Sequence, residues 1–185
     1  MRKFIRIPTV SSEPLHREDC RQGAIFLRKV FTQLGAEATL LSGAEGRNPL
    51  VLGTFKGRGT GKKPRILFVG HYDVVSADPS TWADQQPFEM SGRDGFLYGR
   101  GVSDQKGPVL AVACAASSLL EQRNLDVDVV MLVEGEEESG SAGFKDAVQR
   151  NRHLIGEIDA ILVSRFASHL EHRTDTTRRY AMGIG

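Results

Sequence analysis

The chain has 185 residues with 40% hydrophobic and 25% charged side chains, a composition typical of a globular domain with a substantial core. Its formal net charge of +1 gives no electrostatic basis for binding nucleic acid or a membrane surface. The sequence shows no signal peptide and no apolar run that could span a bilayer, and its two cysteines form no disulfide framework, so we expect a cytoplasmic protein.

The first part of the chain alternates between helical and extended patterns. Apolar residues recur at helical spacing over 17–34, after a Ser-Ser-Glu-Pro helix entry, and Gly35 marks the end of this helix. Three apolar stretches then predict strands at 36–41, 49–55 and 65–69. The Gly- and Lys-rich segment 56–64 suggests a phosphate loop, but its spacing does not match that motif, so we favour an ordinary loop.

The second part begins with a long polar connection at 76–90, which could form the wall of a nearby site. An Asp-Gly pair predicts a short hairpin over 92–98, and the apolar run 108–120 predicts a buried helix with Cys114 in the core. A strand at 126–133, a helix at 142–150 and a strand at 158–163 follow. Strands alternating with helices predict an α/β fold with a mainly parallel sheet flanked by helices.

Groups that bind metals follow two of these strands and a glycine-rich turn. His71 and Asp73 come directly after the strand at 65–69, and Asp104 lies in the turn before the apolar helix. A run of four glutamates, Glu134 and 136–138, follows the strand at 126–133 and is electrostatically costly without a cation. Taken separately, the first pair fits a chance surface loop and the glutamate run fits a solvated acidic loop.

Together these clusters predict a binuclear metal site. In such sites two divalent ions share a bridging carboxylate and activate a water, while a separate carboxylate serves as general base and later as general acid. Histidine and carboxylate ligands without thiolates are typical of zinc, and also suit manganese or cobalt.

Three segments carry a resemblance to a known family. GHYDVV, GRGVSDQKGP and EGEEESGS occur in this order, with a W…PF…LYGRG pattern between the first two. They resemble the M20 metallopeptidases, in the branch of cytosolic dipeptidases, carnosinases and fungal glutathione-degradation proteins. The resemblance covers about residues 4–164 and implies a truncated, zinc-exopeptidase-like catalytic domain.

The resemblance also implies a role for each site residue. His71 matches the ligand of one metal ion, and Asp73 matches the carboxylate that orients this histidine. Asp104 matches the bridging ligand, Glu137 the general base, and Glu138 the ligand of the other ion. The Ser-Gly that follows the acidic run fixes this register, and the two earlier glutamates receive no role.

The resemblance ends after residue 164. Dipeptidases of this branch carry an aspartate ligand where this chain has Arg165, which favours the glutathione-degradation subunit. We therefore expect a partial catalytic domain at 1–164 and a non-matching, disordered tail at 165–185, produced by a shifted reading frame, a retained intron or a truncated gene. His169 and His172 could replace the missing ligands, but the tail lacks the apolar periodicity to hold them.

The sequence thus predicts a metal-dependent hydrolase of small peptides, of the dipeptidase or glutathione-degrading type, in a weakly active or inactive form. An alternative is a non-catalytic partner or regulatory fragment of a glutathione-degrading complex, which would bind a companion subunit. A deacylase of amino-acid conjugates fits the catalytic motifs equally well, but it fits the W…PF and LYGRGVSD segments less well. We expect neither nucleic acid nor a membrane as a partner.

Overall fold

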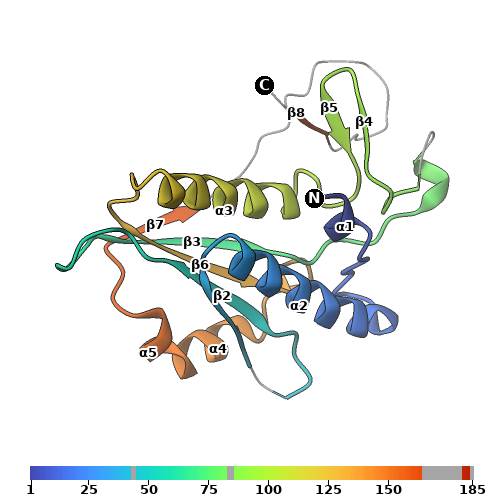
Figure 1. Ribbon diagram of the computed structural model, residues 1–185. Coiled ribbons are helices and arrows are strands. Elements are labelled where there is room, and N and C mark those ends of the chain that lie inside the picture. The colour runs from blue at the N-terminus through green and yellow to red at the C-terminus, as the bar shows by residue number, and fades with distance from the viewer. Residues whose placement is uncertain (43–44, 83–85, 164–180, 184–185) are drawn as a thin grey trace.

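The computed structural model describes residues 1–42, 45–82, 86–163 and 181–183. Its main element is a sheet of five strands (Figure 1). Their order across the sheet is β1 (Glu37–Leu41), β2 (Leu50–Phe55), β6 (Asp128–Glu134), β3 (Arg65–His71) and β7 (Ala160–Val163). Strand β3 runs parallel to both β6 and β7, whereas β2 is antiparallel to β1 and β6. The predicted α/β class is confirmed, and the parallel pairing is confined to β6, β3 and β7.

Helices cover both faces of this sheet. Along β6, Met131 and Val133 pack in the core beneath α2 (Arg17–Gln33) and α3 (Lys106–Glu121), on one face. Val130 and Leu132 point to the other face, which α4 (Phe144–Arg150) and α5 (Arg152–Ile155) cover. This alternation follows from the two-residue period of a strand. Each such side chain contributes about 1.5–3 kcal/mol when fully buried.

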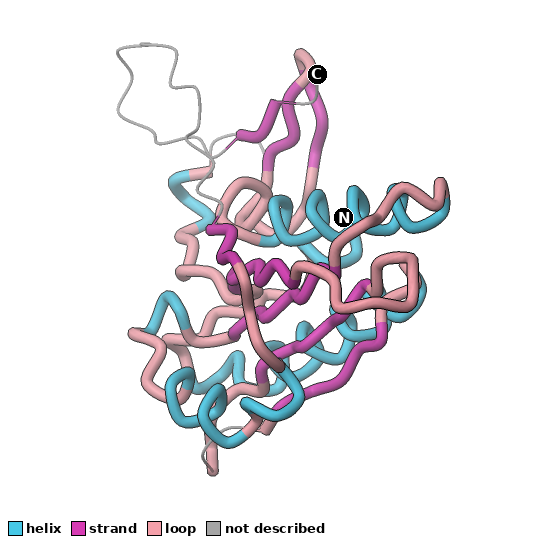
Figure 2. Tube along the Cα trace, turned by 90° about the vertical axis from the view of Figure 1, so that its left-hand side faces the viewer, coloured by secondary structure: helices cyan, strands magenta, loops and turns pink. Residues whose placement is uncertain are grey.

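A second, smaller sheet stands above α3 in the ribbon of Figure 1 and projects from the top of the molecule in the tube of Figure 2. It consists of β4 (Ser91–Arg93), β5 (Phe96–Tyr98) and β8 (Ala181–Gly183), all antiparallel. Asp94 and Gly95 join β4 to β5 with φ angles of +52° and +76°. Positive φ at both central residues is the signature of the hairpin turn that the Asp-Gly pair predicts.

Two local features differ from the sequence prediction. Cys114 is exposed, because the buried stripe of α3 contains Leu110, Ala113 and Ser117, and Cys114 lies one residue outside that stripe. The short helix α1 (Arg2–Ile5) was not predicted, although Phe4 is fully buried. Single-turn 3₁₀ helices also occur, at η1 (Pro14–His16), η2 (Pro79–Thr81) and η3 (Glu137–Ser139).

Among the described residues, the helices are too short or too polar to cross a membrane. Most of the predicted tail, including Arg165, His169 and His172, lies outside the described residues. The boundary at residue 164 therefore stays a prediction.

Candidate metal centre

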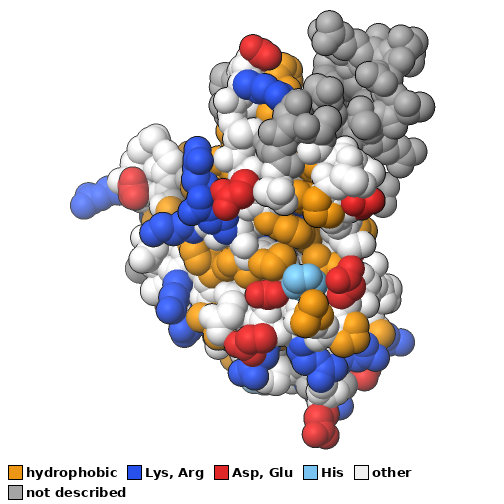
Figure 3. All heavy atoms as spheres, turned by 90° about the vertical axis from the view of Figure 1, so that its right-hand side faces the viewer, with side chains coloured by type: hydrophobic (Ala, Val, Ile, Leu, Met, Phe, Trp, Pro, Cys, Tyr) orange, Lys and Arg blue, Asp and Glu red, His pale blue; other side chains and the backbone are white. Residues whose placement is uncertain are grey.

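The parallel pairing of β3 with β6 brings the candidate residues together. Position His71 on β3 is in register with Glu134 on β6, so the segments that follow the two strands emerge side by side. These strand ends lie on the right of Figure 1, the side that Figure 3 shows from the front. On that face a histidine lies between acidic side chains and is bordered by hydrophobic ones. The carboxyl ends of parallel strands are where open α/β sheets place their sites.

His71 is held from both ring nitrogens and from its backbone. Its side chain is only 6% exposed, and Nδ1 lies 3.0 Å from the carbonyl oxygen of Asp73 and 3.3 Å from Oδ1 of the same residue. On the other side of the ring, Nε2 lies 3.3 Å from Oδ1 of Asp104. The backbone N–H donates to Oε1 of Gln105. These contacts fix the ring with Nε2 directed at the acidic cluster.

Asp73 is fully buried and lies behind His71, not in front of it. Its Oδ1 accepts from the backbone N–H of Glu137 at 3.2 Å, and its Oδ2 accepts from that of Glu138 at 3.0 Å. The same Oδ2 accepts from the Ser11 hydroxyl at 2.6 Å. One carboxylate therefore holds the histidine and the turn η3 in a fixed relation.

Three side chains converge in front of this frame. His71, Asp104 and Glu138 each offer one ligand atom, and these atoms all lie within 4.8 Å of one another. Oε2 of Glu137 lies 3.9 Å from Nε2 of His71, and its side chain is half exposed. All five residues singled out in the sequence, including Asp73, thus belong to one cluster.

The cluster carries an excess of negative charge around one imidazole. Burial alone would lower the pKa of His71, but its hydrogen bonds with Asp104 and Asp73 and the charge of Glu137 raise the pKa to about 10. Burial raises the pKa of Glu138, and the neighbouring carboxylates add to that effect. Without a metal ion, the proton on His71 therefore supplies the positive charge that the carboxylates require.

Glu134 is a further acidic group that the family resemblance leaves without a role. It is 7% exposed, burial raises its pKa to about 7, and its Oε2 has no hydrogen-bond partner among the described atoms. A buried carboxylate without a partner for one oxygen is costly. A cation near the cluster would lower that cost.

Two other residues of the site region act as structural partners. Oε1 of Glu136 accepts from the backbone N–H of Asn48 at 3.1 Å, and Oε2 lies 3.8 Å from the Arg47 guanidinium. Ser11 lies 62 positions before its partner Asp73, and sequence reasoning did not find it. A helix-entry serine carries no signal of such a long-range contact.

Two other candidate regions lie apart from this cluster. In the Gly- and Lys-rich loop, Nζ of Lys63 donates to the carbonyl oxygens of Gly57 at 2.6 Å and Gly59 at 3.2 Å, which supports an ordinary loop.

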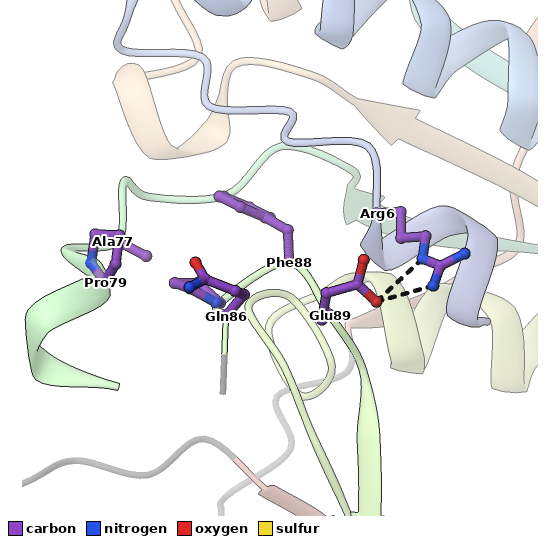
Figure 4. A pocket seen from close by; sticks show the side chains of 7 residues that line it. Arg6, Ala77, Pro79, Gln86, Phe88 and Glu89 are labelled. Carbon is purple, nitrogen blue, oxygen red and sulfur yellow. Dashed lines mark hydrogen bonds and ion pairs between the residues drawn. The ribbon is translucent and has the colours of Figure 1, made fainter. Parts of the chain in front are cut away.

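The polar connection after β3 contributes to a pocket of about 450 Å³. That pocket, shown in Figure 4, is lined by Arg6, Ala77, Pro79, Gln86, Pro87, Phe88 and Glu89. An ion pair joins Arg6 to Glu89, and no member of the cluster lines the pocket.

Comparisons with known proteins place the chain in a family. The model of peptidase family M20/M25/M40 matches residues 67–184. A Saccharomyces cerevisiae protein described as "Probable di- and tripeptidase DUG2" is 38% identical over 174 residues, which cover 89% of this chain and 20% of that protein. The Mus musculus beta-Ala-His dipeptidase is 38% identical over 105 residues, which cover 56% of this chain and 21% of that protein.

A solved structure with the same fold is human carnosine dipeptidase 1. It superposes with a TM-score of 0.79 at 27% sequence identity, over 89% of this chain and 37% of that chain. The present chain spans about a fifth of the length of the two curated relatives named above.

Proposed function

The chain belongs to peptidase family M20/M25/M40, and from that premise we propose that its cluster binds two divalent metal ions for the hydrolysis of small peptides. The observation that supports metal binding is the convergence of ligand atoms from His71, Asp104 and Glu138 within 4.8 Å. The count of two ions comes from the family resemblance, in which Asp104 matches the bridging ligand. Zinc suits this donor set, and manganese and cobalt also fit it.

The residues present suit such ions in charge as well as in type. Burial raises the pKa of both Glu138 and Glu134, and neighbouring carboxylates add to that effect, so a divalent cation at the cluster would stabilise their charged forms. We assign His71 and Asp104 to one ion, and Asp104 and Glu138 to the other. The side chain of Asp104 is 63% exposed, so its carboxylate would be accessible as a ligand shared between the two ions.

The side chains around the ions would then divide the work of hydrolysis. Divalent ions at this place would activate a water and polarise the carbonyl group of the substrate. Glu137, next to the cluster but outside the ligand set, would take the proton from the water and deliver it to the departing nitrogen. Asp73 would hold His71 through Nδ1, so that Nε2 stays directed at the ion.

We base the proposed substrate class on the names of the relatives. Their printed names specify dipeptides and tripeptides, and we infer short peptides, including glutathione breakdown products, as substrates here. Among the described residues each ion would have two protein ligands, fewer than the three typical of catalytic zinc sites. We therefore propose that the chain alone retains metal weakly and turns over slowly, in the cytoplasm.

A second candidate function is that of a non-catalytic partner for a companion subunit. It is favoured by strand β7, where Ile161 and Val163 are 65% and 66% exposed. On its outer edge, β7 pairs with no other strand among the described residues. An open apolar edge of this kind accepts a strand from another chain.

The first experiment tests the metallopeptidase proposal. It measures the affinity of the protein for Co²⁺ and for Zn²⁺ by competition with a chelator of known affinity. His71→Ala should weaken binding at least about tenfold. His153→Ala, which removes an exposed histidine from α5, should leave binding unchanged. Equal binding by the protein and by His71→Ala would contradict the assignment.

The second step measures hydrolysis of Cys-Gly, β-Ala-His and glutathione, with each ion and with a chelator. We expect slow hydrolysis that the chelator abolishes. Hydrolysis that persists without metal would contradict the mechanism. Fast metal-dependent hydrolysis would contradict only the proposal that the chain alone is weakly active.

A further inference from the structure

The N-terminal segment reaches the metal centre through Ser11. Thr9 is fully buried, and its hydroxyl donates to the carbonyl oxygen of Tyr72 at 2.7 Å. The backbone N–H of Val74 donates in turn to the carbonyl oxygen of Thr9, and Val10 forms a parallel bridge with Val74. These contacts align the segment with the residues that follow β3.

This alignment places the Ser11 hydroxyl 2.6 Å from Oδ2 of Asp73. The other groups around that buried carboxylate are the ring of His71 and the backbone N–H groups of Glu137 and Glu138. Each carboxylate oxygen thus has two of these neighbours, and Ser11 shares Oδ2 with Glu138. A short O–H···O⁻ hydrogen bond to an ionised group is among the stronger kinds in proteins.

We propose that Ser11 is a positioning residue of the metal centre, which acts through Asp73. Its hydroxyl fixes the rotation of the Asp73 carboxylate, because the one other contact of Oδ2 among the described residues is the backbone N–H of Glu138, in a short turn. A fixed carboxylate in turn holds the His71 ring and the Glu137–Glu138 backbone at the cluster. The inference rests on the proposed function and adds to it a residue from a distant segment.

The contact with Asp73 is separate from the contacts that anchor the N-terminal segment. Lys106 is fully buried, and its Nζ donates to the carbonyl oxygens of Phe4 at 3.1 Å and Ile7 at 2.7 Å. Thr9 and Val74 hold the next residues, as described above. Removal of the Ser11 hydroxyl therefore leaves the segment in place and changes chiefly the carboxylate.

The first test compares Ser11→Ala, Ser11→Thr and the control Ser12→Ala, which changes the exposed neighbouring serine. Co²⁺ affinity should fall about 10- to 100-fold in Ser11→Ala, the range typical of lost partners behind a metal ligand. Ser11→Thr keeps the hydroxyl and should restore the affinity, and Ser12→Ala should not change it. Wild-type affinity in Ser11→Ala, or equal weakening in Ser11→Thr, would overturn the proposal.

The second test examines the metal-free protein by NMR with ¹⁵N-labelled glutamate. Ser11→Ala should shift the amide signals of Glu137 and Glu138, and Ser12→Ala should not. Unchanged signals in Ser11→Ala would refute the positioning role. If the unaltered protein binds no Co²⁺, the proposed function fails, and these amide signals alone decide the role of Ser11.

A double-mutant cycle with Asp73→Asn completes the test. If Ser11 acts through Asp73, the double variant should bind Co²⁺ no more weakly than Asp73→Asn alone. Additive losses would show that Ser11 acts by another route. Far-UV circular dichroism of each variant establishes that the proteins compared are folded.

Discussion

At the scale of single residues, His71 links the acidic cluster to the stability of the metal-free fold. Its ring is nearly buried, yet its contacts with Asp104 and Asp73 favour the protonated form. The folded-state pKa of about 10 lies above the ordinary value of 6.5. Protonation of His71 thus stabilises the folded protein below pH 6.5, and this contribution is lost as the pH rises towards 10.

The prediction compares the protein with His71→Asn in a metal-chelating buffer. The free energy of unfolding of the unaltered protein minus that of His71→Asn should fall as the pH rises from 6.5 to 10. The fall should be at most about 1.4 kcal/mol per pH unit. Urea titrations at several pH values measure it, with His153→Asn as the control for an exposed histidine. A difference that stays constant, or rises, across this window would contradict the prediction.

Other features at this scale could not be read from the sequence. Gly135 lies in the acidic motif, where glycine suggests only a turn. In the structure, a Cβ on Gly135 would overlap the ring of Tyr72, which is buried and donates to the carbonyl oxygen of Pro49. Such close approaches depend on tertiary packing, and a local pattern does not contain them.

At the scale of elements, apolar periodicity predicted most of the helices and strands. The predicted helix over 17–34 corresponds to α2, and the apolar run over 108–120 corresponds to α3. The antiparallel pairing of β2 was not predicted, because an apolar strand buried on both faces gives no sign of its direction. The order of polar clusters after β3 and β6 did predict where the candidate site lies.

Strand β7 is an exposed edge strand through which we expect copies of the chain to associate. Ile161 and Val163 lie on the same face of an edge strand and are largely exposed. Exposed apolar edges promote association between chains. Lysine at both positions should reduce concentration-dependent association and change the free energy of unfolding by no more than about 0.5 kcal/mol per site.

Light scattering over a range of protein concentrations measures this effect. The control places lysine at Leu15 and Leu119, which are exposed by 86% and 42% on other parts of the surface. Both variants add two positive charges, so a difference between them reports on β7 itself. Equal reductions in both would mean that net charge, and not the strand edge, governs association.

At the scale of the whole molecule, the candidate site is where distant segments meet. Its three converging side chains come from the end of β3, the turn before α3 and the 3₁₀ helix η3. Local motifs identified these residues, whereas their convergence depends on the parallel register of β3 and β6. An ion bound at this place would join the three segments, so metal binding and global stability should be linked.

This linkage can be tested by comparing how much Co²⁺ stabilises two variants of the acidic run, Glu138→Gln and Glu136→Gln. Co²⁺ at 100 times its dissociation constant should raise the free energy of unfolding by about 2.7 kcal/mol. Glu138→Gln should lose most of that gain at the same Co²⁺ concentration, because its ligand atom lies in the cluster. Glu136→Gln alters the same acidic run, but its partners are Asn48 and Arg47, so it should keep the gain. Denaturant titrations with and without Co²⁺ distinguish the two. Equal losses in both variants would mean that the acidic loop attracts the ion through its overall charge, and that the specific geometry of His71, Asp104 and Glu138 does not determine binding.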